Sequence, residues 1–345
     1  MTPVPSMTNE RQVEPERLAV FAPSPIVTVT VEESAGGGPE IHFHAGGQGF
    51  WVARMAAGLG AGVVLCAAIG GESGRVLRAL VEEDGIELRS VNSRRSNGSY
   101  VHDRRTGDRI EVAAVPSPTL SRHEQDELFG VAVTAGLECE VMLLTGSEPD
   151  DVVPADVYRR LAGDLRRNGC RVLADLTGTA LDGALEGGVD IVKLSDEDLV
   201  TLGWAETPEL DDLRPAAEGL NAAGAGNVLI TRAAKGALVL AGDELLEIEG
   251  PRFTALDPHG TGDSMFAALG LGLARGLSFE KSLRLASAAG ALNATRHGLG
   301  SGSRAEIERL ADAVEIRRFP SVGTTEANRR PTPMTERPPG RTFSP

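Results

Sequence analysis

Short apolar runs alternate with longer amphipathic stretches over most of the chain. The apolar runs predict β-strands at residues 26–31, 63–69, 141–145, 171–176, 190–194, 227–231 and 237–241. Several of these runs are apolar on both faces, which is typical of strands buried in a parallel sheet. Helical periodicity predicts helices at residues 49–60, 74–84, 121–135, 154–168, 211–223, 263–275, 279–296 and 304–314. This alternation indicates an α/β fold with a doubly wound sheet.

Three regions depart from this rhythm. Residues 1–18 and 317–345 are polar and contain several prolines, so we expect disordered extensions at both ends. Residues 19–316 would then form one domain. Residues 91–115 alternate polar and apolar positions around a turn at residues 105–108, which predicts a hairpin at the sheet edge or over a pocket.

Composition narrows the possible partners. The 345 residues include 49 acidic and 34 basic side chains, which gives a formal net charge of −15. Such a chain lacks the basic surface that nucleic acids and anionic membranes require, so we expect neither partner. Its three cysteines are far apart in the sequence and form no CxxC pair, which argues against a disulfide framework or a zinc site. These features predict a cytoplasmic protein.

The strongest motif is DPHGTGD at residues 257–263, a glycine-rich turn that leads into a long helix. Gly260 and Gly262 allow backbone N–H groups to converge, and the helix N-terminus adds a partial positive charge, so the turn suits an anion. Asp263 stands beside this anion site. It could cap the helix or accept a proton from a hydroxyl that attacks a phosphate, and spacing alone favours the cap.

A second glycine-rich stretch, HAGGQGFWVAR at residues 44–54, also opens a predicted helix. Its glycines are Gly46, Gly47 and Gly49, which do not have the G-x-G-x-x-G spacing of a dinucleotide-binding turn. The spacing is instead consistent with close approach of the backbone to a small polar ligand.

Together these two stretches resemble the signatures of the ribokinase/PfkB carbohydrate kinase family, nearest its 1-phosphofructokinase and tagatose-6-phosphate kinase branch. GGQGFWVA at residues 46–53 is similar to the family's GGKGxNVA, and the stretch at 257–263 is similar to its DTxGAGD. Three shorter matches lie between them in the family's order: TGSEP at 145–149, DIVKLSDEDL at 190–199 and LITRAAKGA at 229–237. The resemblance covers roughly residues 20 to 316.

The resemblance implies a ribokinase-like three-layer α/β/α sandwich with a small β lid drawn from residues 32–46 and 91–115. The segment before the first glycine signature is short, so we expect this lid to be reduced. It also implies an enzyme that phosphorylates an alcohol group of a sugar or sugar-like molecule, with ATP and Mg²⁺ as cofactors. Asp263 would be the catalytic base, and the amides of Gly260, Thr261 and Gly262 would form the anion hole. The other implied site residues are Gly46, Gly47, Gln48, Trp51 and Asn97 for the substrate, Lys193, Thr231, Gly236 and Asn293 for the nucleotide, and Ser195 and Asp198 for Mg²⁺. Asp257 and residues 298–303 match a monovalent cation site that is common in the family.

The chain departs from the family pattern on the sugar side. Gln48 replaces the signature lysine, and Asn97 stands where related phosphofructokinases hold the sugar phosphate with an arginine. Each charge-assisted contact to a phosphate contributes about 1.5–3 kcal/mol, so a phosphorylated sugar would lose much of its anchor. Trp51 replaces the signature asparagine and is either a core residue or a flat wall of the pocket. The aspartate that the family carries after its first strand is absent from residues 28–34.

Two hypotheses of different class follow. In the first, the protein is an ATP-dependent kinase of a sugar or polyol. In the second, it is a non-catalytic ligand-binding or regulatory protein that keeps the kinase fold, as the altered sugar motifs suggest. The intact stretch at residues 257–263 favours the first, because a binding protein needs no acid beside an anion hole. The sequence leaves a monomer or a homodimer open.

Overall fold

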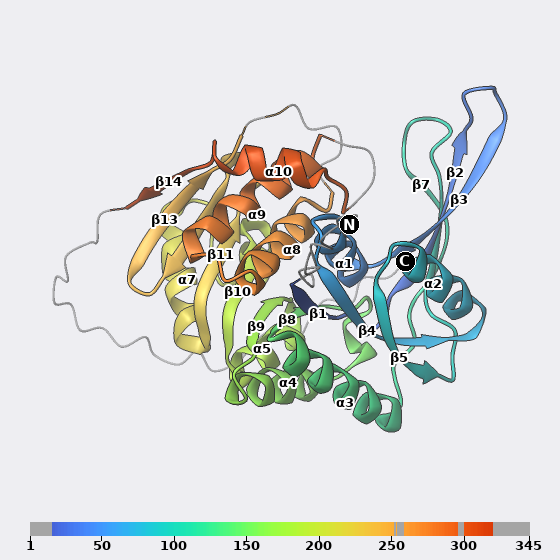
Figure 1. Ribbon diagram of the computed structural model, residues 1–345, viewed down its shortest axis with the longest axis horizontal. Helices are drawn as coiled ribbons and strands as arrows, with labels where there is room; N and C mark the ends of the chain where they lie inside the picture. Colours follow the sequence, from blue (N-terminus) through green and yellow to red (C-terminus); the bar gives the residue numbers. More distant parts are fainter. Residues whose placement is uncertain (1–15, 252, 254–258, 296–299, 320–345) are drawn as a thin grey trace, which may run out of the picture.

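A central sheet forms the middle layer of the molecule (Figure 1). The computed structural model describes residues 16–251, 253, 259–295 and 300–319. In these residues the sheet has ten strands in the order β14-β13-β12-β11-β10-β9-β8-β1-β4-β5. All neighbours from β5 to β11 are parallel, and β11 to β14 are antiparallel. The strands are β1 (Arg17–Phe21), β4 (Gly62–Gly70), β5 (Glu87–Ser93), β8 (Val141–Thr145), β9 (Arg171–Asp175), β10 (Val189–Ser195), β11 (Ala225–Thr231), β12 (Ala237–Ala241), β13 (Glu244–Glu249) and β14 (Glu315–Arg318).

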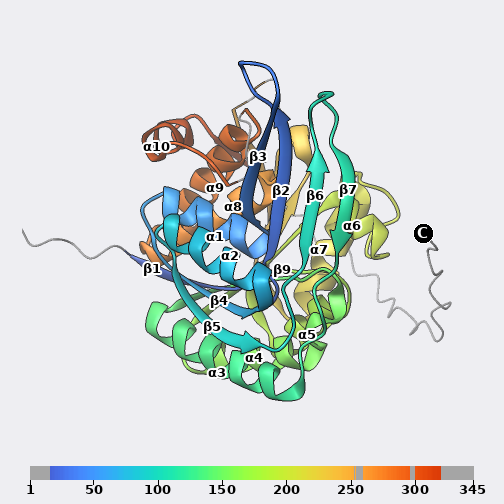
Figure 2. The ribbon, with the colours of Figure 1, turned by 90° about the vertical axis from the view of Figure 1, so that its right-hand side faces the viewer.

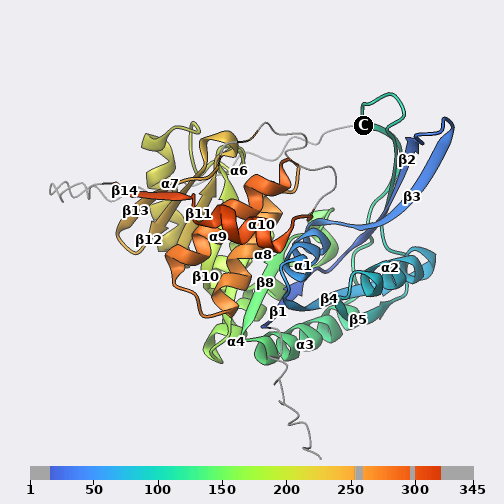
Figure 3. The ribbon, with the colours of Figure 1, turned by 45° about the horizontal axis from the view of Figure 1, so that its top comes forward.

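Helices cover both faces of this sheet, as the apolar runs on both faces of its strands require. The helices are α1 (Gln48–Gly58), α2 (Gly71–Glu83), α3 (Arg122–Cys139), α4 (Ala155–Arg167), α5 (Gly178–Gly187), α6 (Asp196–Thr201), α7 (Leu210–Ala223), α8 (Thr261–Ala274), α9 (Phe279–Asn293) and α10 (Arg304–Ala311). One buried cluster joins the sheet to α3, α4, α5 and α7, and a second joins its other face to α1, α2, α8 and α9. Figure 3 shows α8, α9 and α10 together on their side of the sheet. The result is the expected three-layer sandwich.

A second sheet stands apart from the first (Figure 2). It has four strands in the order β3-β2-β6-β7, namely β3 (Pro39–Gly46), β2 (Ile26–Glu33), β6 (Ser99–Asp103) and β7 (Ile110–Val115). β2 pairs antiparallel with β3 and parallel with β6, and β6 and β7 form a hairpin. This sheet is the lid that the resemblance implies.

Three boundaries and one strand assignment differ from the sequence prediction. The first strand of the main sheet is β1, which begins at Arg17, so residues 17 and 18 do not belong to an N-terminal extension. Residues 26–31, predicted as the first strand of the main sheet, lie instead in β2 of the lid. The lid therefore begins at Ile26 rather than near residue 32, and its first two strands have eight residues each. At the other end β14 extends to Arg318, two residues past the predicted domain boundary.

Candidate active site

A pocket of about 480 Å³ opens at the carboxyl ends of the parallel strands. It lies next to β1, where the strand order reverses: β4 and β5 follow on one side, and β8 to β11 on the other. Such a reversal is the usual ligand site of an open α/β sheet. The lining comes from the segments after β1, β8 and β9, from the start of α1, and from Lys193 and Asp198.

The described part of the glycine turn, residues 259 and 260, leads into the N-terminus of α8. Gly260 is the N-cap residue of α8 with a φ of 71°, a left-handed conformation that glycine adopts readily. The side chain of Asn293 supports the turn: its Nδ2 donates to the carbonyl of His259 at 2.9 Å, and its Oδ1 accepts from the amide of Ser301 at 3.4 Å. The first amides of a helix have no acceptor within the helix, so the amides of Thr261 and Gly262 suit a phosphate.

Asp263 is the third residue of α8 and is partly buried. No side chain caps α8 by a hydrogen bond, so Asp263 does not take the capping role that spacing alone favours. Burial and the neighbouring carboxylate of Asp175 raise the pKa of Asp263 to about 7, although Lys193 and Gln48 act in the opposite direction. A carboxylate that titrates near neutral pH is well suited to accept a proton.

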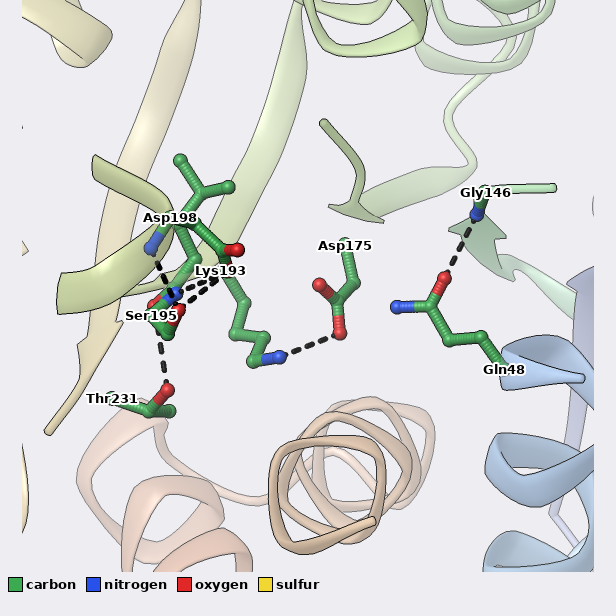
Figure 4. A network of polar contacts seen from close by, with 8 residues as sticks. Gln48, Gly146, Asp175, Lys193, Ser195, Asp198 and Thr231 are labelled. Carbon is green, nitrogen blue, oxygen red and sulfur yellow. Dashed lines mark hydrogen bonds and ion pairs between the residues drawn. The ribbon is translucent and has the colours of Figure 1, made fainter. Parts of the chain in front are cut away.

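A buried ion pair lies beside Asp263, and sequence reasoning found only one of its members. The Nζ of Lys193 donates to Oδ2 of Asp175 at 2.8 Å, and the two side chains are 8% and 7% exposed (Figure 4). The pairing of β9 with β10 places the two residues opposite each other. Burial opposes the charge on Lys193, but the carboxylates of Asp175 and Asp263 outweigh it and raise the pKa of the ammonium. Lys193 is therefore charged.

Gln48, from the first glycine-rich stretch, lies near this pair. It is the first residue of α1, after Gly47 with a φ of 94°. Its Oε1 accepts from the amide of Gly146 at 2.9 Å, and Figure 4 shows its amide nitrogen on the side of Asp175. Burial raises the pKa of Asp175, as it does that of Asp263, and the nearby Gln48 amide opposes the rise for both carboxyl groups.

Ser195 and Asp198 form a capping box at the start of α6. The Oδ2 of Asp198 accepts from the Ser195 hydroxyl at 2.6 Å and from the Ser195 amide at 3.0 Å. Asp198 also lines the pocket. Thr231 lies next to Ser195 on the neighbouring strand, and its hydroxyl contacts the carbonyl of Leu194 at 3.5 Å.

Gly236 stands at the turn between β11 and β12, where a side chain would collide with the backbone. Its φ is 80°, and a Cβ there would lie 2.1 Å from the carbonyl oxygen of Ile248. The backbone geometry of this turn is enough to require a glycine at position 236, whether or not a ligand binds nearby. The pocket described above does not include Gly236.

Asn97, expected to bind the substrate, is instead a structural residue of the β5–β6 connection. It is 6% exposed, and its side chain donates to the carbonyls of Pro25 and Ala68 and accepts from the amide of Gly70. Both amide hydrogens and the carbonyl oxygen are therefore occupied by the backbone. Asn97 does not line the pocket, so we do not carry the substrate role forward.

Trp51 also lies outside the pocket lining. Its ring packs edge-on against Phe50 with the centroids 5.2 Å apart, and it contacts the core cluster under α1 and α8. The core interpretation of Trp51 therefore replaces the pocket-wall interpretation. Gly46 is buried at the base of the lid, where a Cβ would lie 2.6 Å from the hydroxyl of Thr28, while Gly47 lines the pocket.

Sequence reasoning missed the segment of residues 22–26 altogether. Ala22, Ser24, Pro25 and Ile26 follow β1 and line the pocket, with apolar side chains and one hydroxyl. The prediction placed the first strand of the sheet nine or ten residues too late, and so searched for this wall of the pocket in β2. Asp257 and residues 298–299 of the expected monovalent cation site lie outside the described residues.

The comparisons with known proteins agree with this geometry. The model of the pfkB family carbohydrate kinase matches residues 24–306. The chain belongs to the pfkB family of carbohydrate kinases. The predicted resemblance is thus confirmed, and the protein is a phosphotransferase that acts on the hydroxyl of a carbohydrate. Within the described residues, no helix has the length and hydropathy needed to cross a membrane.

Named relatives lie in the expected branch. This kinase is 31% identical to the ATP-dependent 6-phosphofructokinase isozyme 2 of Mycobacterium tuberculosis over 274 residues, which cover 78% of this chain and 79% of the relative. It is 27% identical to the 1-phosphofructokinase of Vibrio cholerae, over 81% of this chain and 88% of the relative. Phosphofructokinase-2 from Escherichia coli, solved with potassium, superposes with a TM-score of 0.76 at 24% identity and covers 86% of this chain and 98% of its own. Arabidopsis thaliana ribokinase gives a TM-score of 0.65 at 21% identity, over 87% of this chain and 99% of its own.

Proposed function

We propose that this kinase transfers the γ-phosphoryl group of ATP to a hydroxyl of a sugar-like acceptor that carries no phosphate of its own, with Asp263 as the general base. The observation that supports it best is the position of Asp263, directly after the glycine turn of α8 and with a pKa raised to about 7. We place the reaction in the cytoplasm, because ATP is supplied there and the cysteines Cys66, Cys139 and Cys170 are free thiols.

The proposed step needs one base and a site for developing negative charge. The acceptor hydroxyl gives its proton to the carboxylate of Asp263, and its oxygen forms a bond to the γ-phosphorus while the bond from that phosphorus to the β-phosphate oxygen breaks. ADP leaves, and the proton on Asp263 passes to solvent. The amides of Gly260, Thr261 and Gly262 stabilise the equatorial oxygens during the transfer.

The residues around the pocket fit ATP with Mg²⁺. A Cβ on Gly262 would lie 2.6 Å from the Nζ of Lys193, so the glycine leaves room for this cation against the first turn of α8. Asp198 supplies a carboxylate and Ser195 a hydroxyl, and Mg²⁺ in such sites needs only one or two carboxylates besides phosphates and water. Mg²⁺ neutralises phosphate charge when bound. No group of three His, Cys, Asp or Glu side chains in the described residues forms a metal cage, which agrees with a metal that arrives with the nucleotide.

The charge of the pocket supports an acceptor without a phosphate. Among the described residues that line it, Lys193 is the one basic side chain, and Asp175 already holds it. The other charged lining residues are Glu148, Asp150 and Asp198, all acidic. A sugar phosphate would enter without a cation to bind it. Two missing charge-assisted hydrogen bonds would cost at least about 3 kcal/mol, or roughly a hundredfold in affinity.

The test compares matched acceptors in an ATP-dependent assay, such as fructose with fructose 6-phosphate and tagatose with tagatose 6-phosphate. We expect a kcat/KM for each free sugar at least about tenfold above that of its phosphate. Glu148→Arg places a cation at the rim and should shift the preference toward the phosphate, whereas Glu82→Arg on the exposed surface of α2 should not. A clear preference of the wild type for the sugar phosphate would contradict the acceptor proposal.

The same set of acceptors distinguishes a kinase from a non-catalytic ligand-binding protein. Turnover on no acceptor, together with measurable binding of one of them, would favour a non-catalytic ligand-binding protein with a kinase fold. The intact turn and the raised pKa of Asp263 make turnover the expected result.

A further inference from the structure

Asn293 is the last residue of α9, and its polar side chain is buried beside the start of α8. The residue is 1% exposed, so both ends of its amide group need hydrogen-bond partners within the protein. Its Nδ2 donates to the carbonyl of His259 at 2.9 Å, and its Oδ1 accepts from the amide of Ser301 at 3.4 Å. One side chain therefore joins the glycine turn before α8 to the segment before α10.

A glycine brings the end of α9 close to the start of α8, and Figure 3 shows the two helices next to each other. A Cβ on Gly290 would lie 2.5 Å from Cγ of Met265 and 3.2 Å from Cγ2 of Thr261. Thr261 is the first residue of α8, and Gly290 stands three residues before Asn293 in α9. Residues three apart in a helix lie on the same face, so this close approach places the asparagine side chain within reach of the turn.

The segment that donates to Oδ1 of Asn293 packs in turn against α1. Gly300 has a φ of 62°, and a Cβ there would lie 2.7 Å from the carbonyl oxygen of Trp51 in α1. Asn293 thus contacts the turn that begins α8 and a segment that rests on α1. The helices that follow the two glycine-rich stretches share this one support.

The hydrogen bond from Asn293 holds the turn by a carbonyl group and not by an amide. No side chain caps α8 by a hydrogen bond, and the N-cap residue Gly260, with a φ of 71°, does little to restrict its own backbone. A capping side chain would fix the turn, but it would occupy an amide that a phosphate needs. A donor to the carbonyl of His259 fixes the turn without competing with an anion for the amides of Thr261 and Gly262.

We propose that Asn293 is a positioning residue for phosphoryl transfer, which holds the glycine turn where its amides meet the transferring phosphoryl group. This inference rests on the anion hole of the proposed function. It replaces the nucleotide-binding role that the family resemblance implies for Asn293, because both ends of the buried amide group contact the protein backbone. Asn293 acts on the phosphates through the turn and does not contact the base of the nucleotide.

The experiment compares the wild type with Asn293→Leu, which keeps a side chain of similar size and removes both the donor and the acceptor. Asn221→Leu is the matched control. Asn221 lies near the end of α7 and away from the pocket lining, and its Nδ2 donates to the carbonyls of Ala225 at 2.7 Å and Gly226 at 3.1 Å. The assay measures kcat with Mg-ATP, the KM of the acceptor, and inhibition by Mg-tripolyphosphate and by adenosine, which represent the two halves of ATP.

We expect kcat to fall by about ten- to a hundredfold in Asn293→Leu, because a displaced turn no longer meets the phosphoryl group. The inhibition constant of tripolyphosphate should rise by at least about threefold, as the loss of one hydrogen bond that supports the turn implies. The inhibition constant of adenosine and the KM of the acceptor should stay within about twofold of the wild type. Asn221→Leu should leave all four quantities unchanged.

An unchanged kcat and unchanged inhibition by tripolyphosphate in Asn293→Leu would overturn the proposal. Weaker inhibition by adenosine alone would also overturn it, since that result places Asn293 against the base. Equal losses for both halves of ATP, or the same losses in Asn221→Leu, would reduce Asn293 to a general structural residue and reject the positioning role.

A wild type without turnover would contradict the proposed function instead. In that case calorimetric binding of tripolyphosphate and adenosine to the same proteins still decides the inference, with the same expected split between the two ligands. If Asn293→Leu fails to fold, Asn293→Ser replaces it with the same expectations, because serine is smaller and its hydroxyl is too short to hold both backbone groups.

Discussion

Asp263 has a pKa near neutrality because its surroundings disfavour the charged form. Burial and Asp175 raise the pKa, and Lys193 and Gln48 prevent a larger rise. The raised pKa of Asp263 determines how the stability of the protein changes with pH. The unfolded chain releases the proton near pH 4 and the folded chain only near pH 7, so folding carries a penalty that grows between these values and is constant above them.

Asp263→Asn should therefore stabilise the protein at pH 8 and change its stability little at pH 4. The reason is that asparagine has no charge to bury, so the variant gains of the order of a few kcal/mol where the wild-type carboxylate is ionised. Urea unfolding at the two pH values measures the difference. A variant that is equally destabilised at both would contradict the raised pKa of Asp263.

Sequence motifs revealed the site residues that stand close together in the chain at the glycine-rich turns. They did not reveal residues that come together only when strands pair in the sheet. Gly260, Gly262 and Asp263 are adjacent in the chain, so their spacing was visible. Asp175 lies eighteen positions from Lys193 and becomes its partner only through the pairing of β9 with β10. Its one local signal was an acid at the end of an apolar strand. Asn97 was misassigned because spacing does not reveal that the backbone occupies its side chain.

Among the elements, the short helix α6 begins with the two residues that are proposed to hold Mg²⁺. Ser195 and Asp198 hold each other in a capping box, and this arrangement fixes the carboxylate that lines the pocket. A second capping box, Ser121 with Glu124, begins α3 and lies outside the pocket. The chain thus contains the same motif at the site and away from it.

Ser195→Ala should cost about 1 kcal/mol of stability through the lost cap and should also raise the concentration of Mg²⁺ needed for half-maximal activity. Ser121→Ala should cost a similar amount of stability and leave the Mg²⁺ dependence unchanged. Activity titrated with Mg²⁺ at fixed ATP, together with thermal unfolding, compares the two. Equal Mg²⁺ dependence in both variants would remove Ser195 and Asp198 from the metal site.

The buried middle of the main sheet was predictable from the sequence, but β1, β5, β13 and β14 were not predicted as strands, and missing β1 affected the site. Buried strands such as β8, β10 and β11 were recognised because their apolar runs are continuous, and the helices because their periodicity is long. β1 was missed because the run at its core is short and follows a polar, charged segment. Its absence shifted β2 into the main sheet and hid the pocket wall at residues 22–26.

For the whole molecule, the net charge of −15 is compatible with a nucleotide because the binding groups are local. The glycine turn before α8 lies against Lys193, and Lys193 lines the pocket that opens beside the strand-order reversal at β1. The lid of β2, β3, β6 and β7 is a separate sheet that continues from the same segment, because Ile26 both lines the pocket and begins β2. The global charge is therefore a reason to expect no nucleic-acid partner, and it does not conflict with a phosphoryl donor.

The most direct test of the account is the rate of acceptor phosphorylation by Asp263→Asn at pH 8, measured beside the affinity of the same protein for Mg-ATP. The account predicts that turnover falls by a factor of about 10²–10⁴, the usual contribution of a general base, while Mg-ATP binds within about threefold of the wild type. Turnover by the variant within a few-fold of the wild type, with acceptor phosphorylation verified, would contradict Asp263 as the base of the reaction.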